Sequence, residues 1–367
     1  MRILVVNAGS SSVKLRLLGA RDTIERSADL AAGPAGFDAA QLARILRGWA
    51  KPDVTGHRIV HGGTAFTGPV LVDDAVREQL RELTDLAPLH QPKSLAALGA
   101  VTAQLPDVPA VASFDTAFHA TIPAAAATYA VPREWRQRFA IRRYGFHGLS
   151  HAYCSQRAAQ LLGLPLAGLR IVTCHLGAGA SLAAVLDGRS IDTTMGFTPL
   201  EGLVMATRSG TVDPGLVLWL EEHEQLTPHE VAIALEQRSG LLALAGTGDM
   251  REVEAAAGRG DPDASLAIDV YLHRLAGGIA AMSAAAGGLD VLVFTGGVGE
   301  HSAAIRRRAA KRLAFLGVAV DDNRNAAGSG DRDISPNAAA VRTLVITARE
   351  DLQIAREARQ VLDNGAP

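Results

Sequence analysis

The residues best suited to chemistry lie at the start of the chain, where an apolar run ends in a polar, glycine-containing stretch. Residues 3–6 are apolar and predict a buried strand, and residues 7–12 read Asn-Ala-Gly-Ser-Ser-Ser. Gly9 permits a backbone turn that other residues resist. Residues 13–18 alternate in polarity and predict a second, half-buried strand. The hairpin tip would form an anion-binding concavity beside Lys14, and an ordinary Gly/Ser hairpin is the alternative.

The same plan recurs in the second half of the chain. Residues 170–182 read as an apolar strand, a polar residue, a glycine turn and a second apolar strand. His175 and Gly177 stand where Asn7 and Gly9 stand in the first copy. The repeat predicts two similar domains that face one another, each presenting a phosphate-binding hairpin. Chance similarity between two hairpins is the alternative.

A third candidate site follows the apolar strand predicted for residues 289–295. This strand enters the glycine-rich turn Gly296-Gly-Val-Gly-Glu300, and a helix is predicted from Ser302. A strand that ends in such a turn before a helix is typical of nucleotide or phosphate sites. A tight turn required only for packing is the other interpretation.

The composition is ordinary for a globular protein and indicates no particular class of macromolecular partner. Its 367 residues exceed what one core usually holds, so two domains are expected. Lys plus Arg number 36 against 38 Asp plus Glu, which gives no electrostatic reason to expect nucleic acid or an anionic membrane. Two cysteines argue against disulfide scaffolding and for a reducing cytosol. We expect neither a secretory segment nor a membrane span.

Strands and helices alternate along the chain, which predicts an α/β architecture. No P-loop motif, dinucleotide fingerprint or zinc spacing occurs in the sequence. Strands are expected at residues 23–27, 54–60, 108–114 and 341–346, helices at 38–47, 94–105, 227–238, 261–286 and 352–362, and a surface loop at 325–337.

The pattern Asn7-x-Gly-Ser-Ser-Ser-x-Lys14 is specific, and it strongly resembles the N-terminal signature of the acetate kinase family of acyl phosphate kinases. Further blocks resemble that family in the right order: residues 56–63, 86–90, 114–119, 143–148, 195–202, 207–210 and 296–300. The resemblance implies the fold of the actin, Hsp70 and sugar kinase superfamily, with two duplicated α/β domains around a central cleft. Domain I would comprise residues 1–119 and 352–367, and domain II residues 120–351, through which a homodimer would form.

The resemblance also implies the residues that act on the acid. Phosphoryl transfer from ATP to a carboxylate needs positioning and charge neutralisation more than covalent chemistry. By resemblance, Arg58 binds the carboxylate, while Arg208 and His147 stabilise the transition state. Asp115 resembles a residue assigned to proton transfer, but a carboxylate nucleophile has no proton to lose at neutral pH, so positioning or metal-water binding is the preferred role. The implied acyl pocket consists of Val60, Leu89, Phe146 and Pro199.

Nucleotide and metal residues are implied in the same way. Asn7 and Glu350 would hold Mg²⁺, with Mn²⁺ as an alternative, directly or through water, because hard oxygen ligands suit these ions. ATP or ADP would contact Ser10, Ser12, Lys14, His175, Leu176, Gly177, Ala178, Gly179, Asp249, Met250, Arg251, Gly297, Val298, Gly299, Glu300 and His301.

The chain departs from the family pattern at some of these positions. Ala178 stands where the family usually has Asn, His301 also replaces an Asn, and residues 348–351 read Ala-Arg-Glu-Asp instead of Thr-Asn-Glu-Glu. The expected function is a cytoplasmic, reversible ATP:acetate phosphotransferase that makes acetyl phosphate. The alternatives are a kinase for propionate, butyrate or another short acid, and an ATPase or non-catalytic member of the superfamily.

Overall fold

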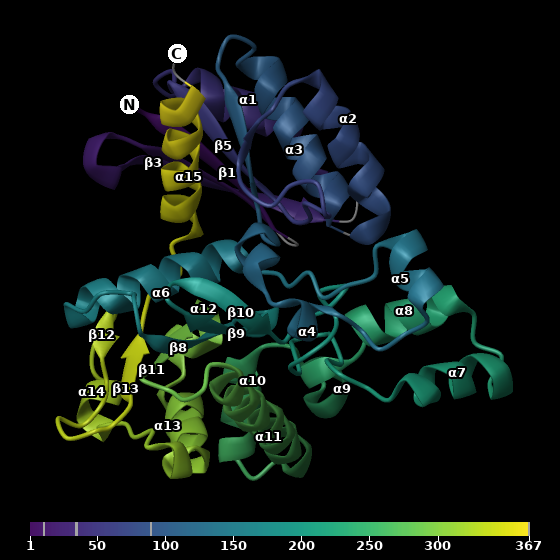
Figure 1. Cartoon of the computed structure of the whole chain (residues 1–367), viewed down its shortest axis with the longest axis vertical. Helices are drawn as coiled ribbons and strands as arrows, with labels where there is room; N and C mark the ends of the chain where they lie inside the picture. Colours follow the sequence, from purple (N-terminus) through teal and green to yellow (C-terminus); the bar gives the residue numbers. More distant parts are fainter. Residues whose placement is uncertain (10–11, 34–35, 89, 366–367) are drawn as a thin grey trace. The chain divides into compact units, whose positions relative to one another are not determined.

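The computed structural model describes residues 1–9, 12–33, 36–88 and 90–365 (Figure 1). The chain forms two compact units, which are described separately below. Unit 1 contains Met1–Ala120, Phe146–Tyr153 and Arg349–Pro367, and unit 2 contains Thr121–Gly145 and Cys154–Ala348.

Unit 1 is built on a mixed sheet with the strand order β4-β3-β2-β1-β5-β7-β6. β1 pairs antiparallel with β2 and parallel with β5, and β5 pairs parallel with β7. The three parallel strands therefore end at the same edge of the sheet. The strands are β1 (Ile3–Ala8), β2 (Ser12–Leu18), β3 (Ile24–Gly33), β4 (Gly36–Phe37), β5 (Val54–Ile59), β6 (Val70–Leu71) and β7 (Ala110–Phe114).

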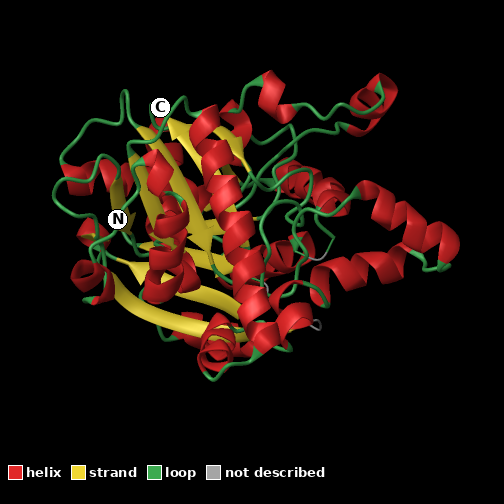
Figure 2. Ribbon diagram, turned by 90° about the horizontal axis from the view of Figure 1, so that it is seen from below, coloured by secondary structure: helices red, strands yellow, loops and turns green. Residues whose placement is uncertain are grey.

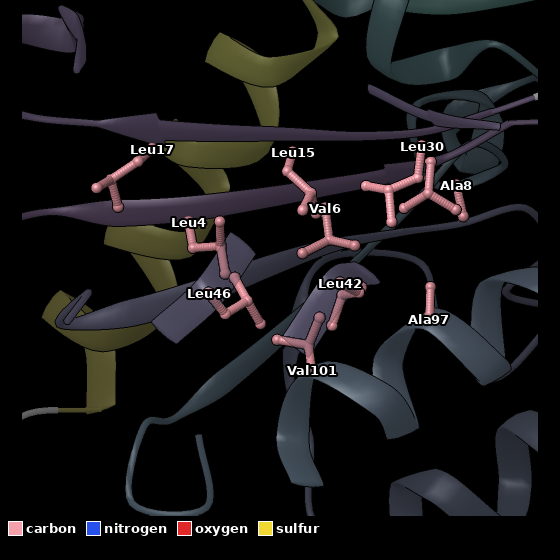
Figure 3. Close-up of a cluster of buried hydrophobic side chains, with 11 residues drawn as sticks. Leu4, Val6, Ala8, Leu15, Leu17, Leu30, Leu42, Leu46, Ala97 and Val101 are labelled. Atoms are coloured by element: carbon pink, nitrogen blue, oxygen red, sulfur yellow. The ribbon is translucent and has the colours of Figure 1, made fainter. Parts of the chain in front are cut away.

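Helices cover both faces of this sheet, and the alternation of side chains along β1 decides which residue meets which helix. Leu4 and Val6 pack with residues of α1 (Ala39–Arg47) and α3 (Gln91–Gln104), as Figure 3 shows. Ile3 and Val5 point the other way and pack against the C-terminal helix α15 (Glu350–Gly365). α2 (Asp74–Glu82) lies beside α3, contributing Leu80 to a further buried cluster.

Unit 2 repeats this plan with the strand order β10-β9-β8-β11-β13-β12. β8 pairs antiparallel with β9 and parallel with β11, and β11 pairs parallel with β13. This is the pairing of β1 with β2, β5 and β7, so the duplication predicted from the sequence is confirmed. The strands are β8 (Arg170–Leu176), β9 (Ala180–Leu186), β10 (Arg189–Thr193), β11 (Val291–Thr295), β12 (Arg332–Asp333) and β13 (Arg342–Val345).

The long helix α11 (Pro262–Ala285) packs on β8, β9 and β10, and Figure 2 shows helices alongside the strands. The Thr227 and Glu230 capping box predicted from the sequence is present at the start of α8. None of the helices in the described part of the chain is long and apolar enough to cross a membrane. The remaining helices are α4 (Ala124–Ala127), α5 (Arg133–Phe139), α6 (Gly148–Leu162), α7 (Pro214–His223), α8 (Pro228–Gln237), α9 (Gly240–Ala245), α10 (Met250–Gly258), α12 (Gly296–His301), α13 (Ala303–Arg312) and α14 (Asp322–Ala326).

Some local predictions were wrong. The segment 325–337 is not simply a surface loop, because Ile334 and Ser335 are fully buried beside β12. The strand predicted at 23–27 runs from Ile24 to Gly33 because its pairing with β2 continues past the predicted end. The glycine-rich stretch from Gly296 is already helical, and α3 begins at Gln91, three residues before its predicted start, with Pro92 in its first turn.

Candidate active site

The candidate site in unit 1 lies where the parallel strands end, on the sheet face that α15 covers. Asn7, Arg58 and Asp115 come from β1, β5 and the residue after β7, which are adjacent in the sheet. They share a face with Val5, Gly56 and Ser113, because side chains alternate along each strand. The carboxyl ends of parallel strands are the usual location of ligand sites in α/β proteins.

Arg58 and Asp115 form the central contact of this row. Arg58 Nε donates to both Asp115 oxygens at 3.0 and 3.1 Å, and Nη2 donates to Oδ2 at 2.6 Å. The side chains are 13% and 1% exposed, so the pair is largely shielded from water. Burial raises the pKa of Asp115 above its ordinary value, although the Arg58 guanidinium opposes this shift. For Arg58, burial lowers the pKa, but the nearby carboxylates of Asp115 and Glu350 raise it, and the net shift is upward.

A second pair joins Asn7 to the first residue of α15. Asn7 Nδ2 donates to Glu350 Oε2 at 2.6 Å, and Arg58 Nη1 donates to Asn7 Oδ1 at 3.3 Å and to the Ala8 carbonyl at 3.2 Å. One N–H of Arg58 Nη2 then has no partner among the residues described. Asn7, Arg58, Asp115 and Glu350 therefore form one connected polar row, called the strand-end row below.

The strand-end row fits a hard divalent cation at one end. Asn7 donates its amide N–H to the Glu350 carboxylate, and its amide oxygen accepts from Arg58, so one residue of each pair carries an oxygen that suits such an ion. Mg²⁺ is often held by one or two protein oxygens plus substrate phosphates. The described residues contain no cluster of three or more His, Cys, Asp or Glu that could hold a metal by itself. A cation here would therefore depend on the oxygen atoms of its substrate.

The β1–β2 hairpin is present as predicted, with Asn7 opposite Lys14 in the register. Gly9 N donates to the Ser12 carbonyl at 2.8 Å, which closes the tip, and Lys14 is exposed. The prediction that the turn needs glycine was wrong, because Gly9 does not have a positive φ and an added Cβ would lie 3.4 Å from Ser12 O. Ser10, like Leu89, lies outside the described residues.

Two of the predicted acyl-pocket residues that the structure describes belong to unit 1. Val60 and Phe146 are 4% and 1% exposed. The Phe146 ring packs edge-on against His61 with centroids 5.5 Å apart, and its carbonyl lies 3.0 Å from His119 Nε2. These contacts fix Phe146 in place. Its neighbour His147 has φ of 56°, a left-handed conformation that costs free energy in a residue other than glycine.

In unit 2 the second hairpin and the glycine-rich segment are neighbours. His175 pairs with Thr295 across β8 and β11. Gly296 has φ of 78°, and a Cβ there would lie 2.8 Å from Leu176 O, so only glycine fits at this junction. The structure thus brings together two of the predicted nucleotide segments, residues 175–179 and 297–301.

Glu300 fixes the backbone of this segment. Its Oε1 accepts from Gly296 N at 3.1 Å and from Ala348 N at 2.9 Å. Arg306, 1% exposed, donates to the carbonyls of Gly299 and Glu300 at 2.8 and 2.9 Å. Arg306 was not predicted as a site residue, because it lies in a run of three arginines that resembles a solvated helix face. Its spacing, one turn after Ser302, is the signal that could have indicated an inward position.

The predicted segment 249–251 begins α10. Asp249 caps this helix by accepting from Arg251 N, and Arg251 also pairs with the carboxylate. Hydrogen bonds from Arg251 lower the pKa of Asp249 to about 2. Met250 is buried, which anchors the turn.

Arg208 and Pro199 are also brought together in unit 2. Arg208 Nη1 donates to the Pro199 carbonyl at 3.1 Å and lies 3.7 Å from Met205 Sδ. A predicted acyl-pocket residue and a predicted catalytic residue are therefore in direct contact.

The fold belongs to the actin-like class, in which two α/β units repeat one plan. A putative N-acetylmannosamine kinase from Listeria monocytogenes has this fold, with a TM-score of 0.51 at 12% identity over the whole of both chains. Two solved structures are much more similar. The acetate kinase of Porphyromonas gingivalis and a propionate kinase of Francisella tularensis each have a TM-score of 0.89 and 36% identity, covering 98% of this chain and 99% of theirs.

The sequence comparisons specify the family. Residues 39–356 match the Acetokinase family. The acetate kinase of Nostoc punctiforme is 51% identical over 313 residues, which cover 85% of this chain and 77% of that protein. The acetate kinase of Clavibacter michiganensis is 45% identical over 386 residues, 97% of this chain and 98% of its own. The chain belongs to the acetokinase family and is a phosphotransferase with a carboxylate acceptor, as the sequence motifs predicted.

Proposed function

We propose that this protein transfers the γ-phosphoryl group of Mg-ATP to acetate, reversibly, to give acetyl phosphate and ADP. The observation that carries this proposal is the partly buried strand-end row in a chain of the acetokinase family. An acetate oxygen forms a bond to the γ-phosphorus while the bond from that phosphorus to the leaving oxygen of ADP breaks. Both reactants are anions, so the site must supply positive charge.

Arg58 would bind the acetate carboxylate. Its remaining Nη2 N–H is available for this, and its contacts with Asp115 hold the guanidinium plane in one orientation. Asp115 then positions Arg58 and needs no proton-transfer role, because its carboxylate already accepts three hydrogen bonds from that side chain. Arg208 and His147 would stabilise charge on the transferring phosphoryl group.

Asn7 and Glu350 would hold the Mg²⁺ of Mg-ATP, with Mn²⁺ as a substitute, directly or through water. The ion would neutralise phosphate charge as transfer proceeds. Lys14, Ser10 and Ser12 would contact phosphate oxygens. The paired segments 175–179 and 297–301, with 249–251, would bind the rest of the nucleotide.

Acetate is the proposed preferred acid because the buried acyl-pocket residues are few and stiff. Val60 is β-branched and 4% exposed, so it would limit the depth of the pocket. We expect acetate first, propionate tolerated and butyrate poor, since an apolar pocket rejects oversize groups by steric overlap. The propionate kinase among the similar structures makes propionate the second candidate.

We also propose that the protein is a cytoplasmic homodimer that assembles through unit 2. α7 has no buried residue, and Leu216, Leu218 and Trp219 are 45%, 57% and 46% exposed on it. A second copy of the chain would cover the apolar side chains of this helix. Exposure of several neighbouring large apolar side chains is unusual in a monomeric protein. Leu218→Glu should yield a monomer in sedimentation velocity, and an unchanged dimer would place the interface elsewhere.

The experiment for function is an acyl-hydroxamate assay with Mg-ATP and acetate, propionate and butyrate. Hydroxamate from acetate at the highest kcat/KM supports the proposal, and preference for propionate or butyrate favours the second candidate. ATP hydrolysis without hydroxamate would indicate an ATPase. Val60→Ala should shift the kcat/KM ratios toward the longer acids, and unchanged ratios would remove Val60 from the pocket.

A further inference from the structure

A polar cluster in unit 2 has no place among the site residues above. Tyr129 follows α4, Arg143 precedes α6, and Glu201 lies in the segment that contains Pro199. The Tyr129 hydroxyl donates to Glu201 Oε2, and Arg143 Nη2 donates to Glu201 Oε1 at 2.7 Å. The Arg143 guanidinium also lies 5.4 Å from the centroid of the Tyr129 ring. Each member of this cluster therefore contacts both of the others.

The cluster holds one loop, residues 194–202, called the acyl loop here. Arg143 Nη1 donates to the carbonyls of Thr194 and Met195 at 3.2 and 3.1 Å. Phe197 N donates to the Tyr129 hydroxyl at 3.0 Å. With Glu201 itself, these bonds fasten the beginning, middle and end of the loop to the cluster.

Close packing supports the same interpretation. A Cβ on Gly196 would lie 1.8 Å from Glu201 Oε2 and 2.0 Å from the Tyr129 hydroxyl, so only glycine leaves room for their contact. The Gly196 carbonyl also accepts from Tyr144 N at 3.1 Å and Gly145 N at 3.2 Å. Burial raises the pKa of Tyr129 above its ordinary value of 10, so its hydroxyl is a donor at neutral pH.

The acyl loop also contacts Arg208, through Pro199. The Pro199 carbonyl accepts from Arg208 Nη1 at 3.1 Å, and Pro199 lies two residues before Glu201. Because a catalytic charge displaced by about 1 Å can lower the rate about 10²-fold, whatever fixes Pro199 also affects the efficiency of Arg208.

We propose that Glu201, held by Tyr129 and Arg143, is a positioning residue that sets the place of the Arg208 guanidinium through the acyl loop. This inference rests on the proposed function in taking Arg208 as the group that stabilises transferring phosphoryl charge. Glu201 touches no reacting atom in this account. Its effect should therefore require Arg208.

A double-mutant cycle tests this dependence. Glu201→Ala should lower kcat for acetyl phosphate formation at least tenfold in the parent protein, with KM for ATP changed less than twofold. In an Arg208→Ala background the same substitution should lower kcat less than twofold. Glu201→Gln should retain part of the activity, since its amide oxygen can still accept from Arg143. Equal losses in both backgrounds would overturn the proposal.

Two further variants separate positioning from loss of folding. Tyr129→Phe removes only a hydroxyl, and should lower kcat about threefold in the parent and not in the Arg208→Ala background. Asp333→Ala is the matched control, since its half-buried carboxylate pairs with Arg342 on the neighbouring strand, away from the acyl loop. It should lower the melting temperature without lowering kcat. An inactive parent protein would count against the proposed function, whereas an active parent with additive losses would count against this inference alone.

Discussion

At the scale of single residues, the site in unit 1 is a set of polar side chains joined by hydrogen bonds. Asp115 alone would be an uncompensated buried charge, and Arg58 offsets it through three hydrogen bonds. Arg58 in turn is oriented by Asn7 and the Ala8 carbonyl. The cost of ordering this arginine is thus met on folding and not on binding the acid.

Removal of either site arginine should lower turnover while the fold persists. We expect Arg58→Ala and Arg208→Ala each to lower kcat at least about tenfold, because loss of one preorganised charge at a phosphoryl site costs on the order of 2–4 kcal/mol. Steady-state kinetics measures this loss, and circular dichroism should report unchanged secondary structure. Near-normal turnover in either variant would remove that residue from the proposed site.

At the scale of elements, the packing of α15 on the sheet determines where Glu350 lies. Gly56 on β5 is the point of closest approach, since an added Cβ would come 2.7 Å from Ile354 Cγ2 and 3.7 Å from the Ala358 Cβ. Glu350 lies one turn before Ile354 on the same helix, so its contact with Asn7 depends on this approach.

Gly56→Ala should therefore lower both stability and activity. Overpacking of this kind typically costs about 1–3 kcal/mol, and moving α15 outward would also separate Glu350 from Asn7. Urea denaturation should give the lower stability, and KM for Mg-ATP should rise. Gly68→Ala is a suitable control because nothing lies within 4 Å of its added Cβ. A destabilised variant with an unchanged KM for Mg-ATP would show that the position of α15 does not affect metal binding.

The hairpin tip of unit 2 carries the departure at residue 178. Ala178 is exposed, and its carbonyl accepts from Ala206 N at 3.1 Å, so the backbone of the tip is held by main-chain atoms. Ala178→Asn should preserve or raise turnover, because a charge-assisted hydrogen bond to phosphate is worth roughly 1.5–3 kcal/mol. A large loss of kcat would mean that the site is built around a small side chain.

At the scale of the whole molecule, buried neutral histidines link stability to pH. Burial lowers the pKa of His57 to about 3, and those of His61 and His119 to about 4, from an ordinary value of 6.5. Below pH 6.5 the unfolded chain gains protons that the folded protein does not bind. Their stabilising contribution is therefore present above pH 6.5 and is lost as the pH falls toward these values.

The test compares His57→Gln with the parent protein. Each such histidine contributes up to about 1.4 kcal/mol per pH unit to the slope of unfolding free energy against pH. Urea denaturation between pH 4.5 and pH 6 should thus give a slope that is smaller by about this amount in the variant. Identical slopes would show that His57 titrates alike in the folded and unfolded states and that burial does not lower its pKa.

The sequence by itself determined the family, the repeated hairpin and most strands and helices. These follow from local signals: apolar runs, capping residues such as Thr227 and Glu230, and the spacing from Asn7 to Lys14. The α/β class could be predicted from the sequence. So could the equivalence of His175 in the second hairpin to Asn7 in the first, because a duplication leaves the same local pattern twice.

Only the tertiary structure decided which of these residues meet. Glu350 is 343 positions from Asn7 in sequence, and Arg58 is 57 from Asp115, so no local pattern could specify their contacts. The same holds for the Tyr129, Arg143 and Glu201 cluster, in which Glu201 is 72 positions from Tyr129 and 58 from Arg143. Ile334 was predicted to lie in a surface loop, and Arg306 was not predicted to be buried, yet both are buried. Burial depends on what packs against a segment, and the polarity of the neighbouring residues in sequence does not indicate that.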